Sequence, residues 1–270
     1  MHTLRLALGA CLLLGDTAAQ AATPLEAAVA AAHRTPEFVA RDPYRHPVET
    51  LAFFGVTPRS HVVEIWPGGG WWTEILAPYL REQGRYTAAS FVVDGPDPSP
   101  YRLRVHGAFM DKLRASPALY DRVQVTHAGP PSSWEIAPPG SADVVLTFRN
   151  VHNWINGDYA DAMFAAMFRA LRPGGVLGLK EHRGAPGMTP EQIRQSGYVP
   201  EERVIEMATR AGFRLEARSE INANPRDTRD YPQGVWTLPP TLRLGEQDRE
   251  RYLAIGESDR MTLKFIKPAG

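Results

Sequence analysis

The chain contains 270 residues, 43% of them apolar, which is enough to bury the core of one α/β domain. Lysine plus arginine and aspartate plus glutamate each number 30, so the formal net charge is zero. This balance argues against nucleic acid as a partner, because its backbone favours a clustered basic surface. Cys11 is the only cysteine, which excludes a disulfide within the chain.

The first 21 residues predict a secretory signal peptide. Residues 6–15 are apolar after a short cationic start, and Ala19-Gln20-Ala21 has the small-x-small pattern of a cleavage site. The apolar run is shorter than the roughly 20 residues that span a bilayer, so no stable membrane anchor is expected. We therefore expect export to the periplasm and cleavage near Ala21. A lipoprotein attached through Cys11 is the weaker alternative, because too few apolar residues precede this cysteine.

Residues 22–46 are expected to form a helical segment ahead of the main domain. Their first part is rich in alanine, and proline and aromatic residues follow. We place the main domain at residues 47–270, with a proline-rich loop insertion at residues 222–244. Long loops of this kind commonly carry substrate-binding residues.

A strand, a glycine turn and a helix start are predicted between residues 61 and 76. The apolar run of residues 62–66 enters Pro67-Gly68-Gly69-Gly70, and the helix-like residues 71–76 follow. Glycine lets the backbone turn sharply and approach a ligand, and a helix N-terminus presents unpaired N–H groups there. A dinucleotide fingerprint would need a third glycine where Thr73 stands, so a nicotinamide-dependent oxidoreductase is the weakest reading.

The second half of the chain predicts further strands and helices. Residues 142–148 are apolar on both alternating faces, as in a buried parallel strand, and end in the polar residues 149–153. Residues 159–171 have helical apolar spacing, and Arg172-Pro173-Gly174-Gly175 ends this helix before a strand at residues 176–179. The remaining elements expected are a helix at residues 200–211 and strands at residues 213–218 and 261–266.

In this order, three segments resemble class I S-adenosylmethionine-dependent methyltransferases: residues 64–70, residues 142–154 and residues 171–175. The resemblance covers roughly residues 47–218 and returns at the carboxyl end. It implies an α/β fold, a Rossmann-like three-layer sandwich with a seven-stranded, mostly parallel sheet. Strand 7 would be antiparallel and inserted between strands 5 and 6, and residues 22–46 would form a lid over the cofactor.

The resemblance also implies S-adenosyl-L-methionine as cofactor and a set of residues that hold it. Glu64 would order the loop and hold the amino group of the cofactor, and Asn150 would shape the pocket. Most members end the second strand in a carboxylate that binds the ribose, but residues 85–91 offer none, and Asp94 is the only near substitute. The complete cofactor set is Glu64, Pro67, Gly68, Gly69, Gly70, Trp71, Asp94 and Asn150.

The function that the resemblance implies is methyl transfer to a small-molecule acceptor. A base that removes a proton from the acceptor is expected at His152, with Glu181 and His182 as further candidates. The histidines lack the i, i+4 spacing of helical metal ligands, so no metal site is expected. An exported binding protein of this fold without catalysis is the alternative. The composition leaves the oligomeric state open.

Overall fold

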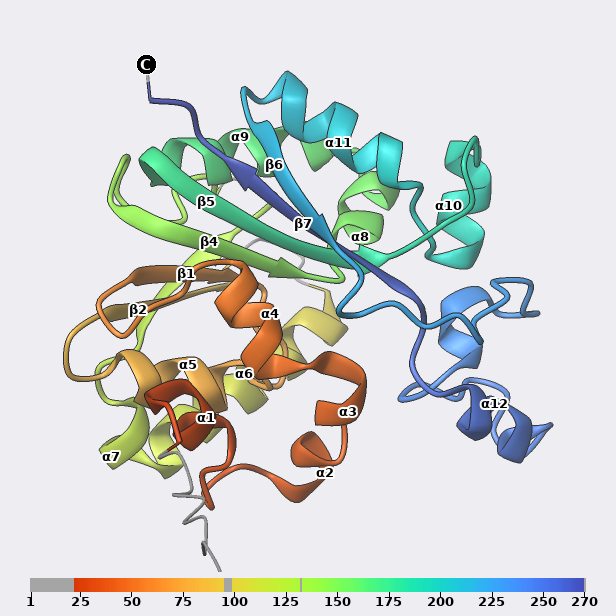
Figure 1. Ribbon diagram of the computed structural model, residues 1–270, viewed down its shortest axis with the longest axis horizontal. Helices are drawn as coiled ribbons and strands as arrows, with labels where there is room; N and C mark the ends of the chain where they lie inside the picture. Colours follow the sequence, from red (N-terminus) through yellow and green to blue (C-terminus); the bar gives the residue numbers. More distant parts are fainter. Residues whose placement is uncertain (1–21, 95–98, 132, 270) are drawn as a thin grey trace, which may run out of the picture.

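The computed structural model describes residues 22–94, 99–131 and 133–269. The predicted signal peptide, including Cys11, lies outside these residues. One sheet runs through the molecule with the strand order β3-β2-β1-β4-β5-β7-β6, in which only β7 runs antiparallel to its neighbours (Figure 1). This order confirms the predicted fold, with strand 7 between strands 5 and 6. The strands are β1 His61–Ile65, β2 Arg85–Phe91, β3 Gln124–Ala128, β4 Ala142–Phe148, β5 Leu171–His182, β6 Arg214–Ser219 and β7 Arg260–Ile266.

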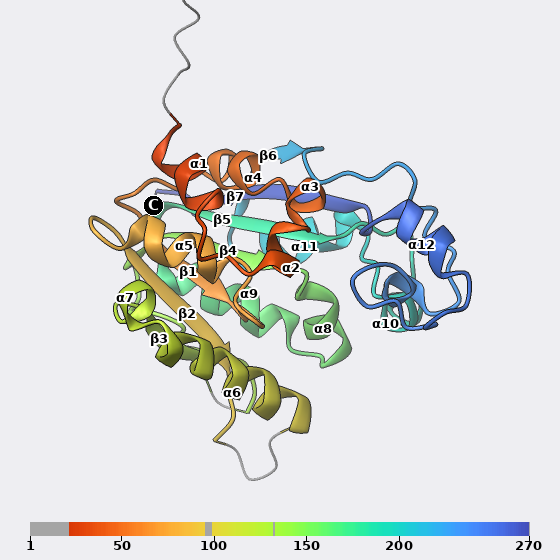
Figure 2. The same cartoon turned by 90° about the horizontal axis from the view of Figure 1, so that it is seen from below.

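Helices cover both faces of the sheet, because its central strands are apolar on both sides. In β1, Val62 packs into the core beneath α4 and α5, whereas the next residue, Val63, packs into the core beneath α9 and α11. Figure 2 shows α1 and α4 above the central strands and α8 and α9 below them. The helices are α1 Pro24–Val29, α2 Pro36–Val39, α3 Asp42–Arg45, α4 Pro47–Phe53, α5 Thr73–Leu80, α6 Pro100–Ala115, α7 Pro117–Tyr120, α8 Val151–Asn156, α9 Ala160–Ala170, α10 Pro190–Ser196, α11 Glu201–Arg210, α12 Arg249–Ile255 and the 3₁₀ helix η1 Gly234–Thr237.

Strand β5 is longer than the sequence pattern indicates. It begins at Leu171, directly after α9, so the segment predicted as a turn belongs to the sheet. The backbone N–H of Gly174 donates to the carbonyl of Lys267, and the N–H of Lys267 donates to the carbonyl of Gly175. These bonds to the chain beyond β7 extend the ladder through a segment whose glycines and proline favour a turn.

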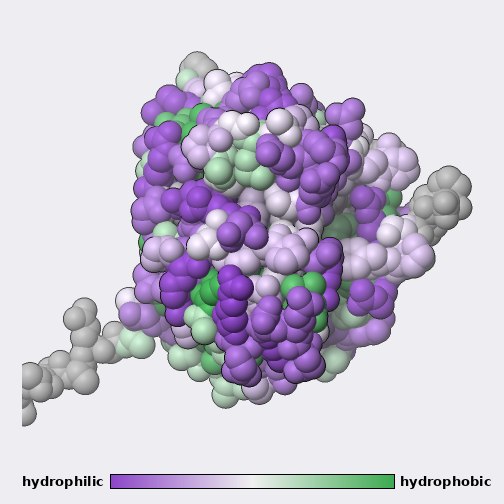
Figure 3. Space-filling view, turned by 90° about the vertical axis from the view of Figure 1, so that its right-hand side faces the viewer, coloured by the Kyte–Doolittle hydropathy of each residue, from purple (hydrophilic) through white to green (hydrophobic). Residues whose placement is uncertain are grey.

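The N-terminal segment and the loop insertion both lie close to the body of the domain. Leu25 of α1 is buried in the core beneath α5, and Thr35 donates both its N–H and its hydroxyl to the carboxylate of Glu74 in α5. The insertion at residues 222–244 contains η1 and precedes α12. Figure 3 shows that the face carrying α10 and α12 is largely hydrophilic, with small separate hydrophobic areas. No helix in the described ranges combines the length and the apolar character needed to cross a bilayer.

Candidate active site

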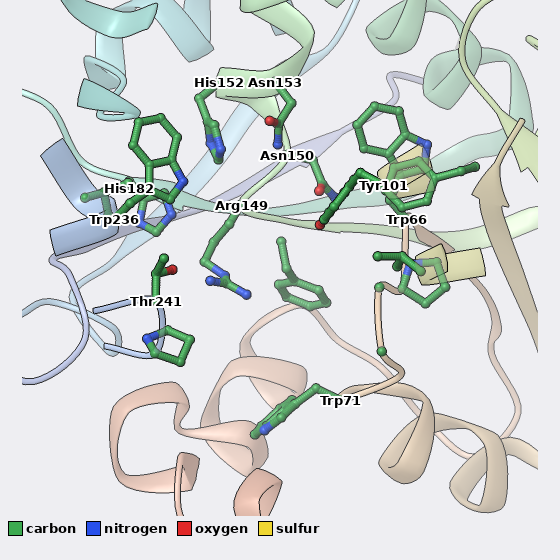
Figure 4. A pocket seen from close by; sticks show the side chains of 18 of the residues that line it. Trp66, Trp71, Tyr101, Arg149, Asn150, His152, Asn153, His182, Trp236 and Thr241 are labelled. Carbon is green, nitrogen blue, oxygen red and sulfur yellow. The ribbon is translucent and has the colours of Figure 1, made fainter. Parts of the chain in front are cut away.

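A cavity of about 930 Å³ lies at the carboxyl edge of β1, β4 and β5. In an open parallel sheet this edge is where ligands bind, because the loops after the strands meet there. The wall comes from the glycine turn, the chain after β4, helix α8, the N-terminal segment and the loop insertion (Figure 4). The sequence-predicted residues on the wall are Glu64, Pro67, Gly68, Gly69, Trp71, Asn150, His152 and His182.

The glycine turn alternates between right- and left-handed backbone. Trp66, Gly68 and Gly70 have φ of 51°, 59° and 84°. A Cβ on Gly68 would meet nothing within 4 Å, whereas a Cβ on Gly70 would lie 3.2 Å from Lys112 in α6. Gly68 and Gly69 therefore line the cavity, and Gly70 instead lets α6 approach the turn. Trp66 adopts a conformation that is rare for a bulky residue, and its indole N–H donates to the carbonyl of Ala128 at 2.9 Å.

Glu64 presents an almost fully buried carboxyl group to the cavity. It is 2% exposed and accepts a hydrogen bond from the Tyr86 hydroxyl at 2.5 Å. Burial raises the pKa of Glu64 to about 7, although the Tyr86 hydrogen bond and the Arg45 guanidinium oppose this shift. The Tyr86 hydroxyl also lies 2.8 Å from the hydroxyl of Thr73. Thr73 therefore has a hydrogen-bonding role at the position where a dinucleotide fold would need glycine.

His152, Glu181 and His182 meet at the ends of β4 and β5. The Nδ1 atom of His152 lies 3.1 Å from Oε1 of Glu181, whose carboxylate also accepts the backbone N–H groups of His152 and His182. Nδ1 of His152 therefore donates, and Nε2 makes no hydrogen bond to the described residues. His182 Nδ1 lies 2.6 Å from the Ser258 hydroxyl. Burial lowers the pKa of His182 well below its ordinary value, and His152 and Arg149 add to this shift.

His152, Glu181 and His182 form a compact cluster although the histidines lack the i, i+4 spacing of helical metal ligands. The ring centroids of His152 and His182 are 5.4 Å apart, and one ligand-type atom each from His152, Glu181 and His182 fall within 4.8 Å of one another. Sequence spacing could not detect them, because they come from different elements joined by the sheet. Glu181 accepts three hydrogen bonds, one of them from the His152 ring, so its carboxylate positions His152.

The strand order and its single antiparallel strand agree with structures of known methyltransferases. An S-adenosylmethionine-dependent methyltransferase from Aquifex aeolicus superposes with a TM-score of 0.55 and 14% identity, covering 84% of this chain and 93% of that one. The chain has the class I methyltransferase fold. Phosphoethanolamine N-methyltransferase 2 from Haemonchus contortus, in complex with S-adenosyl-L-methionine, superposes with a TM-score of 0.54 and 17% identity, covering 84% of this chain and 53% of that one.

This methyltransferase fold does not by itself decide the reaction. The cyclase SpnF superposes with a TM-score of 0.57 and 19% identity, covering 84% of this chain and 82% of that one. No protein-family model matches the sequence, and no curated protein sequence matches it significantly. The side chains around the cavity therefore have to decide the function.

Besides Gly70, two predicted site residues lie away from the cavity wall. Asp94 is exposed, three residues beyond the end of β2 at Phe91, and the structure does not bring it to the cavity. Glu181 is fully buried behind His152. Asn150 lies on the wall and donates to the carbonyl of Ile65 at 2.9 Å, so it ties the end of β4 to the end of β1.

Sequence reasoning assigned no role to three further residues on the wall. Trp66 packs on Phe91 at 4.7 Å between ring centroids, and Tyr101 from the start of α6 lies beside them. Arg149 follows β4 directly and extends into the middle of the cavity (Figure 4). The position of Arg149 after a buried parallel strand was the only signal for it in the sequence. Trp236 of η1, in the predicted loop insertion, also lines the cavity.

Proposed function

We propose that the protein is a S-adenosylmethionine-dependent methyltransferase that acts on a small-molecule acceptor. The observation that carries this proposal is the position of the His152–Glu181 pair on the same cavity as the glycine turn. One side of the cavity can hold a nucleoside-like cofactor against backbone without side chains, and the other offers a base. The methyltransferase fold is compatible with a cofactor site and a base on one cavity.

The residues present fit the cofactor at its amino acid end. Gly68 and Gly69 leave open backbone at the turn, and the carboxyl group of Glu64 suits a cationic amino group. The ribose end has no carboxylate, and the purine can stack on the aromatic side chains of Trp66, Phe91 and Tyr101. When bound, the cofactor supplies an electrophilic methyl group on a sulfonium.

The chain itself then has to orient the acceptor and take its proton. His152 Nδ1 donates to Glu181, which leaves Nε2 as an acceptor for a proton from the nucleophile. Glu181 is a positioning residue, because it fixes the ring and favours the imidazolium without touching the acceptor. Trp236 lies edge-on to His152 at 6.1 Å between centroids and narrows the access of water.

Calorimetry with S-adenosylmethionine and S-adenosylhomocysteine tests the cofactor site. We expect saturable binding of both, and we expect Gly68→Arg to abolish it because the new side chain would enter the open space at the turn. Gly55→Arg is the matched control, since Gly55 also has positive φ and open surroundings but does not line the cavity. Absence of binding to the unmodified protein at millimolar concentration would contradict the proposal.

Transfer of a labelled methyl group from the cofactor to a small-molecule cell extract tests the base. We expect His152→Ala to leave cofactor affinity nearly unchanged and to slow transfer by about 100-fold or more. Glu181→Gln should slow transfer and shift its pH profile, and Glu181→Asp should restore part of the rate. Equal loss of binding and transfer in His152→Ala would assign this side chain to the pocket wall.

An exported binding protein without catalysis is the second candidate. It is favoured by the exposed position of Asp94, which leaves the ribose end without a carboxylate. This candidate predicts that neither S-adenosylmethionine nor S-adenosylhomocysteine binds at millimolar concentration. A nicotinamide-dependent oxidoreductase predicts instead that NAD or NADP raises the melting temperature.

We also propose that the protein is exported and cleaved near Ala21. The proposal depends on the apolar run and the small-residue pattern of residues 6–21, which lie outside the described ranges. Mass spectrometry of the protein from a periplasmic fraction should give a chain that begins near Ala22. A full-length chain in the cytoplasm would contradict export.

A further inference from the structure

The cavity is surrounded by more buried positive charge than the chain neutralises. Glu257 is 2% exposed and serves three guanidinium groups: Arg41 at 2.6 Å, Arg45 at 3.6 Å, and Arg260 through a direct hydrogen bond. Arg149 is the fourth guanidinium group of the cluster, because the charges of Arg260, Glu257 and Arg41 act on it. Glu181 also acts on Arg149, and the buried Lys180 amine lies beside Arg45. Burying charges without enough partners is costly, so this surplus of cationic groups over carboxylates favours a bound anion.

Several guanidinium donors of the cluster have no partner. Nη2 of Arg41 and both Nε and Nη2 of Arg45 are buried and make no hydrogen bond within the described part of the chain. Arg45 is 3% exposed, lines the cavity, and stacks on the Trp71 ring at 4.6 Å. Arg45 Nε faces the Glu257 carboxylate at 3.6 Å, beyond hydrogen-bond distance, and the Nη2 groups of Arg41 and Arg45 remain available to a ligand.

Arg149 points into the same space from the opposite wall. Its backbone has φ of 63° and its N–H donates to the carbonyl of Lys180 at 2.7 Å, which holds a conformation that is rare outside glycine. Figure 4 shows its side chain extending toward Thr241 and Trp71 and away from His152. Within residues 22–94, 99–131 and 133–269 its guanidinium forms no ion pair or hydrogen bond. Burial lowers the pKa of Arg149 to about 10, so it stays charged at neutral pH.

We propose that the cavity binds an oxyanion, a carboxylate or a phosphate, between Arg149, Arg45 and Arg41, and that this group belongs to the methyl acceptor. Planar guanidinium groups match such oxyanions through paired hydrogen bonds. The assignment to the acceptor rests on the proposed function. S-adenosylmethionine carries one carboxylate and two cationic groups, so it is a net cation and leaves the surplus charge of the cluster to an anionic second ligand.

Calorimetric titration of the full chain with inorganic phosphate and with succinate tests the oxyanion site. The titrations are done at constant ionic strength, with and without saturating S-adenosylhomocysteine. We expect both anions to bind in the presence of this nucleoside. Arg149→Gln should lower the affinity for both anions by about tenfold or more. Arg149→Lys should lower it by less, because lysine keeps the charge and loses the paired hydrogen bonds of the guanidinium group. Arg226→Gln, which removes an exposed arginine away from the cavity, should change nothing.

A second arm separates the acceptor from the cofactor. The affinities for methylthioadenosine and S-adenosylhomocysteine are compared, because methylthioadenosine lacks the amino acid carboxylate. Equal affinities of Arg149→Gln and the unmodified protein for both nucleosides support the acceptor assignment. Competition between phosphate and S-adenosylhomocysteine, or loss of affinity for S-adenosylhomocysteine alone, would overturn it.

The outcomes also distinguish the two proposals. Arg149-dependent anion binding in a protein that binds neither nucleoside would support the oxyanion site and contradict the methyltransferase. No anion binding to the unmodified protein, or equal binding to Arg149→Gln in its folded state by circular dichroism, would overturn the oxyanion site.

Discussion

Glu64 illustrates how burial changes a single side chain at the cavity. The sequence shows only an acidic residue in an apolar strand, whereas the structure places its carboxyl group beneath Tyr86 and away from water. The charged form is disfavoured there, so the group holds its proton to higher pH in the folded chain than in the unfolded chain. A cation bound at the glycine turn would favour the charged form of Glu64, so the protonation of Glu64 depends on whether such a ligand is bound.

The stability of the protein should therefore decrease as the pH rises between about 4.5 and 7. The folded chain binds more protons than the unfolded chain in this window, because the pKa of Glu64 is raised from 4.5 to about 7. At about 1.4 kcal/mol per unit, the free energy of unfolding should fall by about 3 kcal/mol relative to Glu64→Gln. Urea unfolding of both proteins between pH 5 and 8 measures this difference. Parallel pH profiles would show that Glu64 titrates normally.

At the scale of elements, Gly178 determines how closely helix α4 approaches the sheet. A Cβ at Gly178 in β5 would lie 2.6 Å from Phe54 and 2.7 Å from Leu146. Phe54 is fully buried at the end of α4, directly over the strand. The contact is invisible in sequence, because the partners are separated by more than a hundred residues and meet only through the order of the strands.

Gly178→Ala is expected to destabilise the protein by about 1–3 kcal/mol, because the added methyl group overpacks the space between β5 and α4. Gly107→Ala is the matched control, since Gly107 lies inside α6 with nothing within 4 Å of its would-be Cβ. It should raise the free energy of unfolding by about 0.5–1 kcal/mol through helix propensity. Thermal unfolding measures the stability of both variants. Equal changes in stability for Gly178→Ala and Gly107→Ala would contradict overpacking at Gly178.

Sequence patterns predicted most elements but not all their limits. The strands β1 and β4 were found because strands buried on both faces are largely apolar, and β7 was found although Thr262 and Lys264 alternate with its apolar residues. The start of β5 was missed because its glycines and proline favour a turn, and the pairing with the chain after β7 outweighs that local preference. Local patterns therefore locate elements better than they locate the ends of elements.

At the scale of the whole molecule, Glu74 connects the N-terminal segment to the sheet domain. Its carboxylate accepts two hydrogen bonds from Thr35 and pairs with Lys112 of α6, and its backbone carbonyl lies 2.8 Å from the ring of His33. It is 1% exposed. Because the N-terminal segment supplies Arg41 and Arg45 to the cavity, this junction also holds part of the ligand site in place.

Glu74→Gln should loosen the N-terminal segment without unfolding the sheet. The amide keeps one acceptor and loses the ion pair, which costs roughly 1–3 kcal/mol at a buried position. Hydrogen exchange should become faster in residues 22–46 and remain unchanged in β1 and β4. Glu82→Gln is the control, since the Glu82 carboxylate is exposed beside Arg81. Unchanged exchange in residues 22–46 would show that other contacts hold the segment.

By itself, the sequence determined the fold class and the place of the glycine turn, because burial on both strand faces and the backbone freedom of glycine are local properties. The tertiary structure alone decided which side chains share the cavity. His152 and Arg149 reach one cavity, with Glu181 behind His152, because β4 and β5 pair in register and end at one edge. Asp94 is exposed three residues beyond the end of β2 and does not line the cavity. The charge of the site is likewise a sum over distant elements, since Glu257 must serve arginines from both ends of the chain.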